Sequence, residues 1–144
     1  MLIAHFSDIH VAPEGKLALH DVDTGTALSH CVRHINNLVP QPNLIVITGD
    51  LTSEGSPEEY AVLRSNLALL DQPYFFVPGN HDNRTNLRAA FSDIRYLQNS
   101  GEFVQYTVEE YPVRLVALDT VSPGEHFGIL CERRLDWLDR TLAA

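Results

Sequence analysis

Three short apolar runs, separated by segments with helical periodicity, constrain the fold of this chain more than any other feature. The runs cover residues 2–6, 43–47 and 73–77 and are rich in β-branched and aromatic side chains. Runs of this length and composition predict buried strands. Because helix-like segments separate them, the strands are expected to be parallel and to share one sheet of an α/β fold.

A polar cluster follows each of the three runs. The clusters are Asp8-Ile9-His10, Gly49-Asp50 and Gly79-Asn80-His81-Asp82. In an open α/β sheet, ligands bind beyond the carboxyl ends of the strands, so the three clusters are expected to converge there. Each cluster alone favours an ordinary turn or helix cap. Their shared position after three successive strands favours a single site.

The side chains of these clusters suit divalent metal ions. Asp8 and His10 are two residues apart, so on an extended segment they point to the same side and can bind one cation together. The Asp50 carboxylate can bridge two cations, and Asn80 adds a neutral amide oxygen. Because this set of oxygen and nitrogen ligands contains no thiolate, it predicts two divalent ions of Mn, Fe, Zn or Co rather than copper(I) or an iron–sulfur cluster.

A pair of such cations activates water and holds a phosphoryl group for in-line displacement, so hydrolysis is the leading hypothesis. His81 is the candidate to protonate the leaving alkoxide or to bind a nonbridging phosphate oxygen, and Asp82 is the candidate to orient its ring. Arg84 is a candidate substrate contact, since a guanidinium binds phosphate oxygens in a planar fork. A surface ion pair is the alternative role for Arg84.

With these motifs in place, the chain resembles the calcineurin-like metallophosphoesterase superfamily, and within it the branch of bacterial cyclic-nucleotide and glycerophosphodiester phosphodiesterases. Segments 7–10, 49–52, 55–60 and 78–84 carry the resemblance, and 118–120 is a weaker match. The resemblance covers the whole chain. It implies an α/β sandwich of two β-sheets flanked by helices, of which this chain would supply the first sheet and an incomplete second sheet.

The resemblance also implies roles for individual residues. Asp8 and His10 would hold the first metal, Asp50 would bridge the two metals, and Asn80 would hold the second. His81 would assist the leaving group.

The end of the chain departs from the pattern of the superfamily. The resemblance implies further histidine ligands from two later motifs, and residues 121–144 contain neither motif. His126 is the only histidine there and is expected to be a solvated loop residue. Residues 1–144 are therefore interpreted as a single calcineurin-like phosphoesterase domain that lacks the C-terminal histidine motifs. With so few ligands, metal binding is expected to be weak, above all at the second site.

Two functions follow from these observations. The first is metal-dependent hydrolysis of small phosphodiesters, such as cyclic nucleotides or glycerophosphodiesters, at a dinuclear centre. The second is a truncated, catalytically incompetent fragment that acts only through association. An apolar sheet face left open by an incomplete second sheet would also favour homo-oligomerisation.

Charge and composition bear on partners and location. The formal net charge of −9 argues against nucleic acid or an anionic membrane as the main partner. No segment approaches the ~20 apolar residues needed to span a bilayer, and no signal peptide is evident, so a cytoplasmic location is the default expectation. Cys31 and Cys131 are expected to be buried free thiols.

The remaining segments predict helices and a hairpin. Helices are expected from about 28 to 38, 57 to 70, 86 to 91 and 132 to 143, and a hairpin from 103–109 and 113–119. In the last helix, Leu135, Leu138 and Leu142 share one face, which Trp137 would anchor. The irregular segment 15–23 is expected to be a loop, with a low expectation of substrate contact for His20 and Asp21.

Overall fold

The computed structural model describes residues 1–19, 21–98 and 100–144, and His20 lies outside this range. Its first sheet contains three parallel strands in the order β1-β2-β3. The strands are β1 (Ile3–Ser7), β2 (Leu44–Thr48) and β3 (Tyr74–Val77). The predicted parallel strands are confirmed, each beginning one residue later than expected. Because the strands are parallel, all three carboxyl ends lie at the same end of the sheet. The polar clusters follow the strands there.

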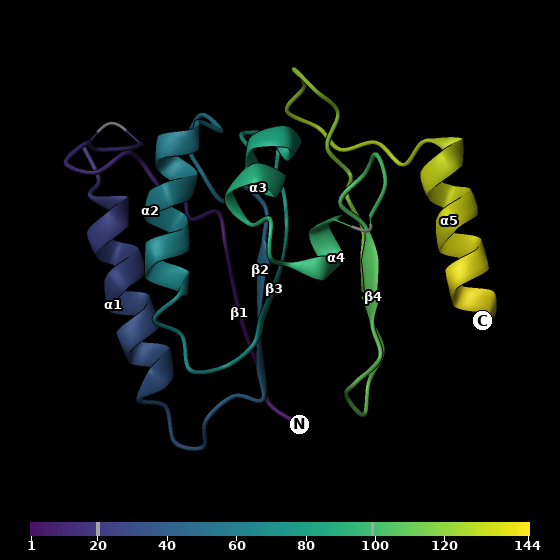
Figure 1. Ribbon diagram of the computed structural model, residues 1–144, viewed down its shortest axis with the longest axis horizontal. Helices are drawn as coiled ribbons and strands as arrows, with labels where there is room; N and C mark the ends of the chain where they lie inside the picture. The colour runs from purple at the N-terminus through teal and green to yellow at the C-terminus, as the bar shows by residue number, and fades with distance from the viewer. Residues whose placement is uncertain (20, 99) are drawn as a thin grey trace.

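Helices α1 (Thr24–Asn36), α2 (Pro57–Leu67) and α3 (Arg84–Ala90) accompany this sheet, with α1 and α2 on one side of it (Figure 1). Their starts have clear local causes. Asp23 caps α1 by accepting from the Thr26 amide, and Ser56 and Glu59 form a capping box at α2. Asn83 caps α3, so this helix begins immediately after the third polar cluster.

A second sheet lies on the opposite side of the first sheet (Figure 1). It consists of β4 (Tyr106–Val108) paired antiparallel with β5 (Leu115–Ala117), which confirms the predicted hairpin with shorter strands. The short α4 (Arg95–Gln98) precedes it, and α5 (Glu132–Ala143) follows as the outermost layer. The result is an α/β sandwich of two sheets flanked by helices, as the resemblance implied.

The main core lies between the first sheet and the helices. Ile45, Ile47 and Phe76 are completely or almost completely buried there, and the Phe76 ring meets Phe91 edge to face at 5.0 Å. Val46 lies on the other face of β2, faces the second sheet and is only half-buried. Burial is therefore uneven, with a close-packed helical side and a looser side between the sheets.

Strand β1 is not buried as expected. Its residues alternate between exposed and half-buried, with Ile3 38% exposed. The cause is topological: β1 is at the edge of its sheet, and the register aligns His5 with Val46, so His5 faces the side of the second sheet. Since the second sheet has two strands in the described residues, it leaves this side of β1 open.

The predicted last helix is confirmed over residues 132–143 as α5. On it, Leu135 is 46% and Leu142 63% exposed, whereas Arg134 is buried with its guanidinium 4.2 Å from the centre of the Phe103 ring. Cys31 and Cys131 are free thiols but half-buried rather than buried. Among the described residues, no helix is both long enough and apolar enough to cross a membrane.

Candidate metal centre

His10, Asp50 and His81 come together at the carboxyl ends of the three strands. One potential metal-binding atom from each residue lies within 4.8 Å of the others. The Nε2 atom of His10 is 3.6 Å from Oδ2 of Asp50, and the centres of the His10 and His81 rings are 4.9 Å apart. Three clusters separated by about 40 and 30 residues in sequence therefore form one group of nitrogen and oxygen donors.

The backbone beneath this group adopts an uncommon conformation. Asp8, His10 and Asp50 have φ values of 52°, 46° and 35°, in the left-handed region that side chains other than glycine rarely adopt. Hydrogen bonds from the His10 and Val11 amides to the segment after β2 hold them in place. Residues in such conformations cost about 1–3 kcal/mol each and concentrate at functional sites.

Close packing of the backbone explains Gly79. A Cβ atom at this position would lie 2.1 Å from both the amide nitrogen and Oδ1 of Asp50. The His81 amide donates to the same Oδ1 at 3.0 Å. Only glycine lets the third loop approach Asp50 this closely.

Asp82 has a different role from the predicted one. Its carboxylate accepts hydrogen bonds from the amides of Leu51, Thr52 and Gly79 and from the hydroxyls of Thr52 and Tyr60. Burial raises the pKa of Asp82, against the opposing effect of these donors. Asp82 thus joins the loops after β2 and β3, and the prediction that it orients the His81 ring is wrong.

The Ser53 carbonyl orients that ring instead. It lies 2.6 Å from Nδ1 of His81. A carbonyl oxygen only accepts hydrogen bonds, so Nδ1 carries a proton, and Nε2 is the nitrogen available to the site. Nε2 can then bind a cation when the ring is neutral or donate a proton when the ring is charged.

Asp8 and Asn80 line a cavity of about 320 Å³ beside the donor group. Gly49 and Gly79 also line this cavity, and so do His126 and Phe127. His126 is exposed, as predicted, but it borders the candidate site. Sequence spacing gave no sign of this, because the segment reaches the cavity through the pairing of Val121 with Gly128.

These residues fit bound divalent cations. Nδ1 of His10 is buried and has no hydrogen-bond partner among the described residues, which is costly for a ring nitrogen that binds nothing. The surrounding donors are the nitrogen and oxygen atoms that Mn, Fe, Zn and Co prefer. The group of three donors contains His10, Asp50 and His81, and Asp8 and Asn80 line the adjoining cavity.

Arg84 is engaged by the protein itself. Its Nε and one terminal nitrogen lie 2.6 and 2.7 Å from the two carboxylate oxygens of Asp119, and it also donates to the Val121 carbonyl. Asp119 is completely buried. These contacts support the ion-pair alternative, although the pair is buried rather than on the surface. They tie the loop that carries Asn80 and His81 to the chain that follows β5.

Comparison with known proteins agrees with this geometry. The model of the calcineurin-like phosphoesterase family matches residues 1–139. The chain belongs to this family. The match includes all three polar clusters and both sheets. The donor group is therefore interpreted as a metal-binding site of a calcineurin-like phosphoesterase.

Several curated proteins are similar to this chain. A probable glycerophosphodiester phosphodiesterase, GpdQ of Arcobacter nitrofigilis, is 39% identical over 142 residues, which are 99% of this chain and 52% of the relative. A probable cyclic nucleotide phosphodiesterase of Rhodococcus erythropolis is 32% identical, with 98% and 47% covered. The 3',5'-cyclic adenosine monophosphate phosphodiesterase CpdA of Pseudomonas aeruginosa is 30% identical, with 99% and 50% covered. The chain thus spans about half the length of these relatives.

Proposed function

We propose that this chain carries the metal-binding half of a phosphodiesterase site that acts on small phosphodiesters. The observation that carries the proposal is the convergence of His10, Asp50 and His81 beside a cavity that Asp8 and Asn80 line. The names of the relatives, glycerophosphodiester and cyclic nucleotide phosphodiesterases, support diesters as the substrate class.

In this proposal, Asp8, His10, Asp50 and Asn80 hold two divalent cations. Such cations supply an activated water and neutralise charge on the phosphoryl group. The metal identity predicted from the ligands remains Mn, Fe, Zn or Co.

The chain's own residues would position the substrate and move a proton. Protonated at both nitrogens, His81 keeps Nδ1–H on the Ser53 carbonyl and directs Nε2–H toward the leaving oxygen. Asp82 fixes the loop on which His81 stands by accepting from the Gly79 amide at 2.9 Å. His126 and Phe127, on the cavity wall, are placed to contact the part of the substrate that does not react.

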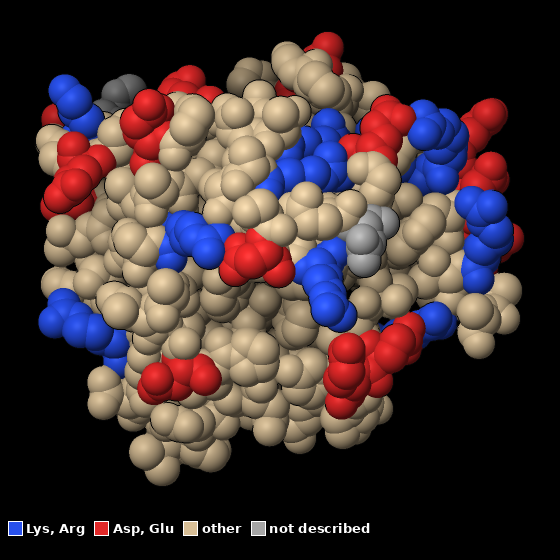
Figure 2. All heavy atoms as spheres, in the orientation of Figure 1, with Lys and Arg blue, Asp and Glu red and all other residues tan. Residues whose placement is uncertain are grey.

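Charge on the surface is compatible with a small substrate. On the face shown in Figure 2, Lys and Arg side chains lie scattered among Asp and Glu side chains rather than gathered in one basic area. A nucleic-acid backbone is bound mainly through clustered basic side chains. A small diester needs only the local field of the site.

The test is manganese-dependent hydrolysis of bis(p-nitrophenyl) phosphate by the purified chain, with bound manganese counted. Asp50→Ala and His81→Ala should abolish turnover, whereas His30→Ala, an exposed change on α1, should retain it. Bound manganese without turnover would favour the alternative of an incompetent fragment that acts through association. A chain that neither binds manganese nor turns over substrate would refute the site itself.

A further inference from the structure

Another cavity lies beside α5, apart from the metal centre. It has a volume of about 280 Å³ and is lined by one face of α5 and by the segment that precedes β4. The helix contributes Arg133, Trp137 and Arg140, and the segment contributes Phe103 and Gln105. Among the described residues, it shares none with the lining of the cavity beside the metal centre, so it is a separate candidate site.

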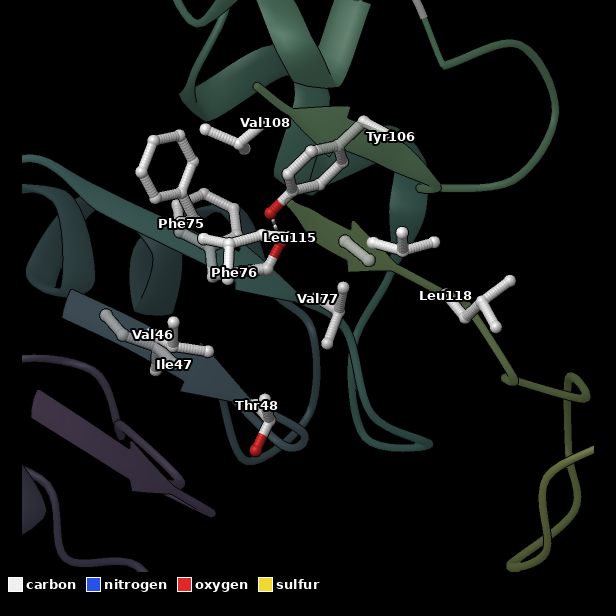
Figure 3. Close-up of a pocket in the computed structure, with 12 residues that line it drawn as sticks. Val46, Ile47, Thr48, Phe75, Phe76, Val77, Tyr106, Val108, Leu115 and Leu118 are labelled. Atoms are coloured by element: carbon white, nitrogen blue, oxygen red, sulfur yellow. Dashed lines mark hydrogen bonds between the residues drawn. The ribbon is translucent and has the colours of Figure 1, made fainter. Parts of the chain in front are cut away.

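Gln105 faces this cavity from the outer side of the second sheet. The next residue, Tyr106, points the other way, into the space between the sheets, where its hydroxyl donates to the Phe76 carbonyl at 2.8 Å (Figure 3). Successive side chains of an extended segment point to opposite faces, so Gln105 points toward α5. It is 7% exposed, and its Oε1 is buried with no hydrogen-bond partner among the described residues. An unpaired buried amide costs free energy, which favours a ligand that bonds to it.

Trp137 supplies the ring on which a planar ligand can stack. The other aromatic ring of the cavity, Phe103, is engaged by the protein, because the guanidinium groups of Arg133 and Arg134 lie 5.5 and 4.2 Å from its centre. Trp137 is half-buried and lines the cavity. An indole in such a position offers a flat apolar surface to a flat ligand.

The charges that line the cavity cancel. Arg133 and Arg140 are matched in number by Glu102 and Asp136. Arg133 is paired with Glu102 at 2.5 Å, and Nε of Arg140 donates to the Asp136 carbonyl within α5. Two positive and two negative side chains leave no formal charge at neutral pH. The lining therefore fits an uncharged ligand group better than an anion.

We propose that this cavity binds a nucleobase, with its ring stacked on Trp137 and its edge hydrogen-bonded to Gln105. Its volume is just below the range of about 300–1,000 Å³ that holds drug-sized ligands, so it accommodates one ring system. Adenine carries a donor and an acceptor side by side, at N6 and N7, and a glutamine amide pairs with both. Rotation of the Gln105 amide about its last bond brings its oxygen and nitrogen to that edge.

Binding of adenosine to the purified chain in EDTA tests the inference, and it requires neither bound metal nor turnover. Trp137 is the only tryptophan in the chain, so its fluorescence should change as adenosine saturates the cavity. Equilibrium dialysis gives the dissociation constant of each variant. Trp137→Ala and Gln105→Leu should each weaken binding by roughly tenfold or more, because they remove the stacking ring and the hydrogen-bonding amide. Gln105→Leu keeps the test decisive if Trp137→Ala fails to fold, since it removes a buried polar atom that has no partner among the described residues.

Two other ligands and one variant are the controls. Purine riboside, which lacks the N6 amino group, should bind roughly tenfold more weakly than adenosine, whereas AMP should bind within about threefold of adenosine because the lining carries no net charge. Phe127→Ala removes an exposed ring from the cavity beside the metal centre and should leave adenosine binding unchanged. Adenosine that does not saturate the chain, binding that tolerates both Trp137→Ala and Gln105→Leu, purine riboside that binds as well as adenosine, AMP that binds far more tightly, or loss of binding in Phe127→Ala would each overturn the inference.

Discussion

Replacing Gly79 with alanine tests whether close packing of the two loops builds the metal centre. The new methyl group would lie 2.1 Å from two atoms of Asp50, and ordinary contact begins at 3.4 Å. One loop must therefore retreat by about 1.3 Å. Because a misplacement of about 1 Å at a reacting centre costs about 100-fold, manganese affinity or turnover should fall by roughly this factor, or about 2.7 kcal/mol.

Stability should fall as well. Overpacking of this kind costs about 1–3 kcal/mol, measured as the free energy of unfolding in urea with EDTA present. Gly25→Ala is the matched control, since its new methyl would meet only ordinary contacts at 3.7 and 3.8 Å, within the first turn of α1. It should leave manganese affinity unchanged and the fold at least as stable.

The assay is electron paramagnetic resonance of free manganese during titration of each variant. The two glycine variants should differ by about 100-fold in dissociation constant. If Gly79→Ala binds manganese within threefold of the unaltered chain while remaining folded, the loops are not held together as inferred, and Asp50 is not a ligand that depends on this packing.

Three further substitutions test the hydrogen bonds and the ion pair that hold the loops and helices around the site. Asp82→Asn should destabilise the chain by about 1–3 kcal/mol, because an amide cannot accept from all five donors. Burial raises the pKa of Asp82, so the protonated Asp82 carboxyl is favoured more in the folded state than in the unfolded chain. The unfolding free energy of the unaltered chain should therefore fall as pH rises from 3.8 through the raised pKa. The penalty of Asp82→Asn in urea denaturation should therefore be larger at acid pH than at pH 7, and an equal penalty at both would contradict the assignment. Arg84→Met leaves the buried Asp119 carboxylate unpaired and should cost about 3–5 kcal/mol, with Arg84→Lys costing less; equal stability of all three chains would show that the pair is not formed. Ser56→Ala removes half of the capping box of α2 and should cost about 1 kcal/mol, seen as a lower melting temperature, whereas no change would argue against the cap.

The first sheet and the position of the site could be predicted because both follow from local patterns. Apolar runs, helical spacing and caps lie within short windows of sequence, and the carboxyl ends of parallel strands meet by geometry alone. The convergence of His10, Asp50 and His81 follows from these facts.

Other contacts were not predictable, because they depend on packing between distant segments. The residues that precede and follow Asp82 in the sequence do not indicate that five hydrogen-bond donors surround its carboxylate. Those around His81 do not indicate that the Ser53 carbonyl will accept a hydrogen bond from its ring. The exposure of β1 depends on how many strands the opposite sheet has, which the sequence of β1 does not contain. The pairing of Arg84 with Asp119 joins residues 35 positions apart.

The pair of Arg84 and Asp119 joins two parts of the molecule and should also couple their opening motions. Arg84 begins α3 directly after the loop of His81, and Asp119 follows β5 and also accepts from the Val104 amide ahead of β4. The second sheet cannot separate from the first without exposing a completely buried carboxylate. Backbone amides of residues 79–84 and of β4 should therefore exchange hydrogen with solvent at one common rate, as a single opening unit.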